Sequence, residues 1–150
     1  SKVGTDMFAQ ILASEQASER VVLRGEHWTA FVPFAARWPL EVHMLPHQHV
    51  PDFAATDGAQ RDELARLYLT LLQGIDALYE TPTPYIAAWH QAPVNVGRDH
   101  IRLMLQVTSP RRAENKLKFL AGSEAAMGAW IGDVPPEQSA ELIREGIARV

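Results

Sequence analysis

The fold is decided by residues 40–80, LEVHMLPHQHVPDFAATDGAQRDELARLYLTLLQGIDALYE. Apolar and polar residues alternate over residues 40–45, which predicts a β-strand with one buried face. Leucine, isoleucine and tyrosine then recur at helical spacing over residues 59–80, which predicts one long amphipathic helix. Asp57 with Gln60 three positions later is typical of a capped helix start. This stretch therefore predicts a strand followed by one long helical crossover.

Further strand and helix patterns lie on both sides of this stretch. A short helix is expected with Met7, Phe8, Ile11 and Leu12 on one face and Thr5 or Asp6 as its cap. Strands are expected at residues 20–24, 28–34, 85–89 and 100–108. A final helix is expected at residues 136–150, with Ala140, Ile143, Ile147 and Val150 inward. This order predicts an α+β fold, an antiparallel sheet with helices packed mainly on one face. A doubly wound parallel sheet would need a helix between most strands, and these helices are missing from the pattern.

The strand expected at residues 100–108 alternates clearly. One face, expected to pack on helices, carries Ile101, Leu103, Leu105 and Val107. The other face, which can line a groove, carries His100, Arg102, Met104, Gln106 and Thr108.

The chain has 150 residues and a formal net charge of −4. The length predicts one domain over residues 1–150. The acidic balance argues against a nucleic-acid or membrane partner, because both usually require a basic surface. The absence of cysteine excludes disulfides and a cysteine nucleophile. With no signal-peptide pattern and no apolar run long enough for a membrane span, we expect a cytoplasmic protein.

Two histidine-bearing segments are candidates for chemistry. His90 ends a predicted strand within residues 89–93, where it is either a rim residue that serves structure or part of a site in the following loop. His47 and His49 alternate after the strand at residues 40–45 and point the same way, as metal ligands do. No third ligand accompanies them, which favours a structural or surface role.

A third candidate is the segment of residues 111–124. Four basic residues, Arg111, Arg112, Lys116 and Lys118, precede Gly122, Ser123 and Glu124. Cations for a phosphate and a carboxylate for hydroxyl groups are what a sugar phosphate requires. The alternative is a solvated basic loop. The sequence contains no nucleophile elbow, phosphate-binding loop, dinucleotide fingerprint or HExxH motif, and no His-x-His-x-His string.

At these same places the sequence resembles the C-terminal half of the galactose-1-phosphate uridylyltransferase family. The matching runs are residues 26–33 (EHWTAFVP), 38–41 (WPLE), 45–50 (LPHQHV), 84–85 (PY), 89–93 (WHQAP) and 118–124 (KFLAGSE). The resemblance implies a histidine-triad-like sheet. It also implies a part in uridylyl transfer between UDP-glucose and galactose 1-phosphate through a covalent uridylyl-histidine. In this family the nucleophilic histidine and the zinc ligands lie in the N-terminal half, so we expect no catalytic residue and no cofactor in this chain.

The resemblance also assigns substrate-binding residues within residues 118–124. Lys118 matches a lysine near the hexose phosphate. Phe119, Ala121 and Glu124 match positions that line the hexose site, with Glu124 as the hydroxyl acceptor. Ser123 stands where many members of the family have tyrosine.

A second, structural metal site found in some members is not expected here. His90 matches one of its ligands. The positions of two other histidines are occupied by Met104 and Gln106, and a thioether and an amide are poor substitutes for imidazoles at an iron or zinc site.

The resemblance therefore implies the C-terminal half of an enzyme, as a fragment or as the product of a split gene. We expect the chain alone to be inactive, and to associate either with an N-terminal half or with itself. Two other functions remain open: a stand-alone nucleotide-binding protein of the histidine-triad type, and a non-catalytic binding or assembly module.

Overall fold

The structure, a computed structural model, describes residues 6–150. Its helices and strands are α1 (Met7–Gln16), β1 (Val21–Arg24), β2 (Trp28–Phe31), β3 (Leu40–Pro46), α2 (Gly58–Asp76), β4 (Ile86–His90), β5 (Met104–Ser109), β6 (Arg111–Ala113), β7 (Lys116–Leu117), α3 (Gly122–Met127) and α4 (Pro136–Ile147). Five strands form one sheet in the order β1-β2-β3-β5-β4, and every neighbouring pair is antiparallel. The predicted α+β fold with an antiparallel sheet is confirmed.

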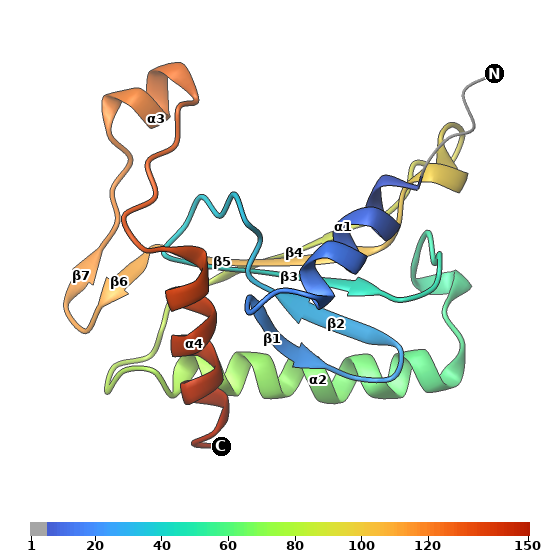
Figure 1. Cartoon of the computed structure of the whole chain (residues 1–150), viewed down its shortest axis with the longest axis horizontal. Coiled ribbons are helices and arrows are strands. Elements are labelled where there is room, and N and C mark those ends of the chain that lie inside the picture. The colour runs from blue at the N-terminus through green and yellow to red at the C-terminus, as the bar shows by residue number, and fades with distance from the viewer. Residues whose placement is uncertain (1–5) are drawn as a thin grey trace.

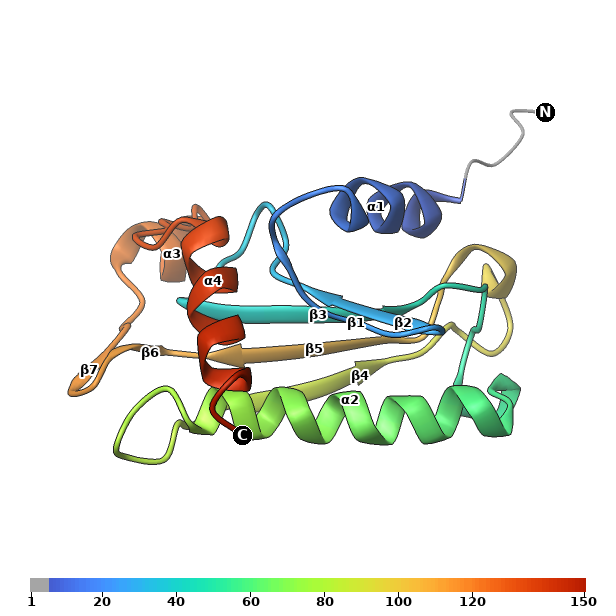
Figure 2. The same cartoon turned by 60° about the horizontal axis from the view of Figure 1, so that its bottom comes forward.

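Helices cover the sheet unequally (Figures 1 and 2). α2 and α4 pack on one face over the main core, whose fully buried side chains include Trp28, Leu71 and Ile143. α1 lies on the opposite face, where Leu12 packs with Phe31 in a smaller cluster. Two helices on one face and one short helix on the other agree with the prediction. On α1, however, Met7 and Ile11 are exposed, so the expected apolar stripe of that helix is only partly buried.

The long helix α2 starts as predicted and ends earlier than predicted. Asp57 accepts a hydrogen bond from the amide of Gln60, and the Gln60 side chain accepts one from the amide of Asp57. The helix stops at Asp76, whose carboxylate accepts a hydrogen bond from the amide of Thr83 after the turn. Leu78, in the turn after the helix, is still buried in the core, so the helical spacing of apolar residues in the sequence extends past the end of the helix itself.

The strand expected at residues 100–108 begins only at Met104. Residues 98–100 form a 3-10 turn. By the register that pairs Met44 with Leu105, Leu103 would face Pro46, which has no amide hydrogen to donate. The Arg102 guanidinium instead donates hydrogen bonds to the carbonyl oxygens of Pro46 and His47. These contacts bury the Arg102 side chain, which was expected to line a groove.

The expected strand at residues 28–34 is also shorter and ends at Phe31. In the final helix, Ala140 and Ile143 are fully buried as predicted, whereas Val150 is exposed beyond the end of α4.

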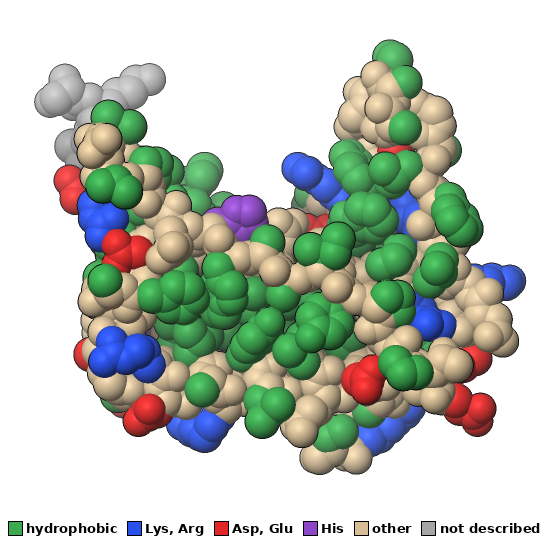
Figure 3. Space-filling view, turned by 180° about the vertical axis from the view of Figure 1, so that it is seen from behind, with side chains coloured by type: hydrophobic (Ala, Val, Ile, Leu, Met, Phe, Trp, Pro, Cys, Tyr) green, Lys and Arg blue, Asp and Glu red, His purple; other side chains and the backbone are tan. Residues whose placement is uncertain are grey.

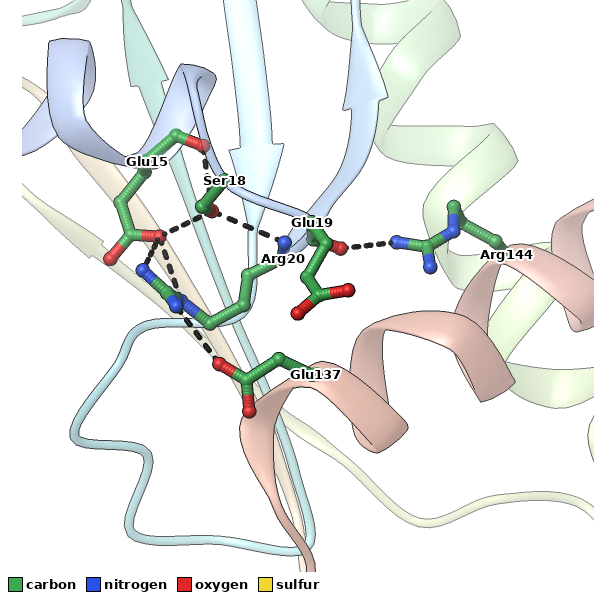
Figure 4. A network of polar contacts seen from close by, with 6 residues as sticks. All are labelled: Glu15, Ser18, Glu19, Arg20, Glu137 and Arg144. Carbon is green, nitrogen blue, oxygen red and sulfur yellow. Dashed lines mark hydrogen bonds and ion pairs between the residues drawn. The ribbon is translucent and has the colours of Figure 1, made fainter.

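Ionic contacts connect α4 to the start of the sheet (Figure 4). Arg20 pairs with Glu15 and with Glu137, each at 2.9 Å.

α2 and α4 cross at a point where both helices carry glycine. A Cβ atom on Gly146 would overlap the carbonyl oxygen of Gly74, and one on Gly74 would overlap Ile147. The close approach of the two backbones therefore depends on these glycines.

Replacing Gly146 by alanine is expected to destabilise the fold by about 1–3 kcal/mol, the usual cost of overpacking a core. Thermal unfolding of the variant measures this loss. Gly58→Ala is the matched control, since a Cβ at Gly58 meets nothing within 4 Å. An unchanged midpoint for Gly146→Ala would show that the two helices separate freely.

Within residues 6–150, no helix has the length and apolar character needed to span a membrane.

Candidate substrate site

Residues 110–133 form an arm that stands out from the end of the sheet (Figure 1). The sequence predicted a strand end followed by a basic loop. The structure instead has a two-stranded hairpin, β6 and β7, followed by the short helix α3. α3 is capped at its C-terminus by Gly128, whose φ of 64° lies in the left-handed region that favours glycine.

Lys118 is buried at the base of this arm, with 8% of its surface exposed. Its ammonium group donates to the carbonyl oxygens of Arg37 (3.0 Å) and Ile131 (2.6 Å). It also pairs with the Glu124 carboxylate at 2.7 Å. A lysine has three N–H donors, so all of its donors have partners within the chain.

Glu124 lies in the first turn of α3 and is buried beside Lys118. Its carboxylate accepts hydrogen bonds from the amides of Ala121 (2.9 Å) and Ile131 (3.2 Å). The hydrogen bond from Lys118, followed by that from the Ala121 amide, lowers the pKa of Glu124 to about 2. The carboxylate therefore stays charged at neutral pH and closes the loop between residues 121 and 131.

The sequence left open whether this segment binds a sugar phosphate or is a solvated basic loop. The structure places Lys118 and Glu124 in a buried ion pair that satisfies backbone groups. They fix the shape of the arm.

Tryptophan packing anchors the arm to the loop between β2 and β3. The ring of Trp130 lies 5.4 Å from the ring of Trp38, and the Arg37 guanidinium and the Lys118 ammonium lie over Trp130 at 5.8 and 5.7 Å. The Glu41 carboxylate, in turn, accepts hydrogen bonds from the amides of Arg37 (2.7 Å) and Trp38 (3.3 Å). The arm is thus tied to the sheet through this loop.

A cavity of about 240 Å³ opens at the base of the arm. Its lining comprises Arg112, Lys118, Phe119, Ala121, Glu124, Ile131 and Asp133. Four of the five predicted substrate-binding residues are therefore brought together, and Ser123 is not among the lining residues. Phe119 is 84% exposed, so an apolar side chain is presented to solvent beside a polar cavity. Apolar surface next to a few polar groups is the usual make-up of a small-molecule site.

Two of the lining residues, Ile131 and Asp133, were missed as members of the site, because they enter the cavity from the far side of α3. Arg112 was named in the sequence only as one of four basic residues that could bind a phosphate. Arg112 forms an ion pair with Asp133. Only the return of the chain after α3 brings these two residues together.

A hydrogen-bonded chain of side chains crosses the sheet on the face opposite α2. His90 donates to Gln106 Oε1 (3.1 Å), and Gln106 and His43 both donate to Glu41 Oε1 at 3.0 Å. Burial alone would raise the pKa of Glu41, but the hydrogen bonds from His43, the Arg37 amide and Gln106 outweigh it and lower that pKa to about 2. His90 is therefore hydrogen-bonded to the Gln106 amide, which is itself bonded to the buried Glu41 carboxylate.

The side chain of His47 also has a structural partner. Its Nε2 atom lies 2.8 Å from Thr29 Oγ1, whereas His49 is exposed. Within the described part of the chain, no three His, Asp or Glu side chains are grouped closely enough to hold a metal ion.

The purified chain is expected to carry far less than one equivalent of iron or zinc. Met104 and Gln106 supply no imidazole beside His90, and a closed transition-metal site needs about four ligands. Elemental analysis after chelator treatment measures this. Near-stoichiometric metal would show that a different ligand set operates.

Comparison with known proteins identifies the family. Residues 1–149 match the family model described as the galactose-1-phosphate uridyl transferase C-terminal domain. The galactose-1-phosphate uridylyltransferase of Streptomyces lividans is 44% identical over 95% of the chain, and that of Rattus norvegicus is 38% identical over 84%. These matches cover 43% and 34% of the two relatives, so the chain spans less than half of their length.

Solved structures agree with this assignment. One described as the structure of a uridylyltransferase has a TM-score of 0.90 and 30% identity, over 99% of this chain and 46% of that one. A zinc-bound histidine triad family protein from Mycobacterium smegmatis has a TM-score of 0.62 at 16% identity, which supports the histidine-triad-like fold alone. The chain therefore belongs to the family of the galactose-1-phosphate uridyl transferase C-terminal domain.

Proposed function

We propose that this chain, as one domain over residues 1–150, is the C-terminal half of a cytoplasmic UDP-glucose–hexose-1-phosphate uridylyltransferase. Its own task is to bind the hexose phosphate in the cavity at the base of the arm. The observation that carries this proposal is that one cavity is lined by Lys118, Phe119, Ala121 and Glu124. The family resemblance in the sequence assigns these same four residues to the substrate. They come from the loop after β7 and from the first turn of α3.

The contacts of the lining residues indicate the role of each of them in the cavity. Lys118 and Glu124 hold the loop closed and set the position of the backbone around residues 119–121. The exposed ring of Phe119 offers an apolar face on which the C–H side of a pyranose can pack. Ser123, which lies outside the lining, is proposed to influence the site only through the backbone of α3.

The nucleophile is proposed to come from a second half. Covalent uridylyl transfer needs an activated side chain with a base and an orienting group. In the described residues, His90 and His43 are committed to Gln106 and Glu41, and no such trio is assembled. The zinc site expected of the complete enzyme is likewise assigned to that other half.

The surface around β4 is the proposed site of association. β4 is an edge strand, so one side of it has no strand partner among the described residues. Ile86 on β4 and Leu69 on α2 are 69% and 57% exposed. Figure 3 shows hydrophobic side chains gathered across the middle of the face seen from behind, and exposed apolar patches of this kind mark partner surfaces. An N-terminal half is the proposed occupant, and a second copy of the chain is the alternative.

The experiment mixes the purified chain with the separately expressed part of the Streptomyces lividans relative that it does not match. Analytical ultracentrifugation is expected to show a complex, and the mixture is expected to transfer uridylyl groups from UDP-glucose to galactose 1-phosphate. Each part alone is expected to show background turnover only. Turnover by this chain alone, lost in His90→Ala, would contradict the proposal. A strictly monomeric chain that binds neither partner at high concentration would favour a non-catalytic module.

A further inference from the structure

The cavity at the base of the arm holds two cations with unequal freedom. Lys118 has partners for all three of its N–H donors, two of them backbone carbonyls. The guanidinium of Arg112 has five N–H donors, and its only partner among the described residues is the Asp133 carboxylate. A phosphate that enters the cavity therefore finds free donors on Arg112.

Exposure separates the two ion pairs further. The side chains of Lys118 and Glu124 are 7% and 2% exposed, whereas those of Arg112 and Asp133 are 44% and 30% exposed. An exposed ion pair contributes little to stability, but breaking a buried pair leaves an uncompensated charge. A ligand can therefore displace the Asp133 carboxylate from Arg112, but it cannot displace the Glu124 carboxylate from Lys118.

We infer that Arg112 is the residue that recognises the phosphate group of the hexose phosphate, and that the Asp133 carboxylate pairs with the Arg112 guanidinium when no ligand is bound. This inference rests on the proposed function and adds a specificity-determining residue to it. A planar guanidinium binds two oxygens of a phosphate side by side, which a point charge on lysine does not do. Lys118 then acts as a positioning residue that shapes the cavity.

The charges that line the two cavities beside Arg112 favour one of them for the phosphate. Arg112 borders a second cavity, whose other lining residues include Arg111, Glu141 and Glu145. The two glutamates would repel a phosphate there, and the Arg111 guanidinium donates to the carbonyl oxygens of Pro82 and Glu114. The cavity at the base of the arm is the less repulsive side, because both of its carboxylates, Glu124 and Asp133, are ion-paired, whereas Glu141 and Glu145 form no ion pair among the described residues.

The test titrates the wild-type chain and its variants with galactose 1-phosphate, inorganic phosphate and galactose, followed by NMR. Arg112→Ala is expected to weaken both phosphate ligands by about tenfold or more while galactose binding stays the same, since a charge-assisted hydrogen bond is lost. Arg112→Lys should recover only part of the affinity. Asp133→Asn should strengthen phosphate binding, because it removes the competing carboxylate. Lys116→Ala, which deletes an exposed cation on neighbouring β7, is the matched control and should change nothing.

Each outcome bears on a separate claim. Equal phosphate affinity in wild type and Arg112→Ala, or an equal loss in Lys116→Ala, overturns the inference. If inorganic phosphate binds through Arg112 but galactose 1-phosphate does not bind, the inference stands and the proposed substrate is wrong. If the wild-type chain binds neither phosphate ligand, Arg112 is not a phosphate site, whatever the reconstituted enzyme does.

Discussion

Replacing Lys118 by alanine is expected to release the arm from the sheet and to lower uridylyl transfer by the reconstituted enzyme about ten- to a hundredfold. The variant removes the donor that joins the carbonyls of Arg37 and Ile131, and it leaves the buried Glu124 carboxylate without its cation. A buried charge without a partner is strongly unfavourable, so the loop between residues 121 and 131 should open.

Hydrogen exchange distinguishes this effect from general unfolding. The amides of Ala121 and Ile131, which donate to Glu124, should exchange at least about tenfold faster in Lys118→Ala, because the arm opens locally. Core amides of β3 and β5 should keep their protection, since the arm contributes no side chain to the main core. The double variant Lys118→Ala with Glu124→Ala should be less severe than either single variant. Unchanged exchange at residues 121 and 131 would contradict the anchoring role.

The largest loss of global stability is expected for Glu63→Ala. The Glu63 carboxylate, 7% exposed on α2, accepts hydrogen bonds from the amides of Glu26 (2.6 Å), His27 (2.6 Å) and Trp28 (3.1 Å). It therefore holds the turn between β1 and β2. Removing the acceptor takes a hydrogen bond from three amides, of which that of Trp28 is buried. We expect a loss of about 3 kcal/mol, since a buried donor left unsatisfied costs about 1–3 kcal/mol and each other lost hydrogen bond about 1 kcal/mol. For a domain of this size the thermal midpoint should fall by roughly 6–12 °C.

Two variants make this measurement specific. Asp62→Ala removes a neighbouring exposed carboxylate from the same helix and should leave the midpoint nearly unchanged. Burial alone would raise the pKa of Glu63, but the amide hydrogen bonds of the turn, led by that of His27, lower it below its usual 4.5. Stability from this carboxylate is therefore present above pH 4.5 and is lost as the pH falls through the lowered value. Glu63→Gln should make stability less sensitive to acid, and an equal acid dependence in both proteins would contradict this account.

The sequence predicted the framework of the sheet because local patterns determine it. The alternation around Leu103, Leu105 and Val107 marked buried positions correctly, and the Asp57–Gln60 pair marked the start of α2. Element ends were less predictable, because contacts from distant residues set them. The last residue of α2, Asp76, accepts a hydrogen bond from the amide of Thr83, and no spacing rule anticipates that contact.

The substrate-binding role of residues 118–124 stays a prediction, to which the structure adds the contacts of each side chain. Resemblance placed Lys118 and Glu124 near a hexose phosphate, and they do line one cavity. Their burial could not be read from the sequence, because it depends on Trp130 and Ile131 returning over them after α3. Arg112 was one of four candidate cations in the sequence, and nothing distinguished it from the others, since Asp133 becomes its partner only in three dimensions.

Galactose 1-phosphate-dependent uridylyl transfer by a joined chimera tests the central claim most directly. This chain replaces the matching part of the Streptomyces lividans relative, to which it is 44% identical, and the covalent link removes any doubt about association. The chimera is expected to transfer uridylyl groups from UDP-glucose to galactose 1-phosphate, with the rate falling about tenfold or more in Arg112→Ala and unchanged in Lys116→Ala. A folded chimera that transfers nothing to galactose 1-phosphate would contradict the assignment of this chain as the hexose-phosphate half.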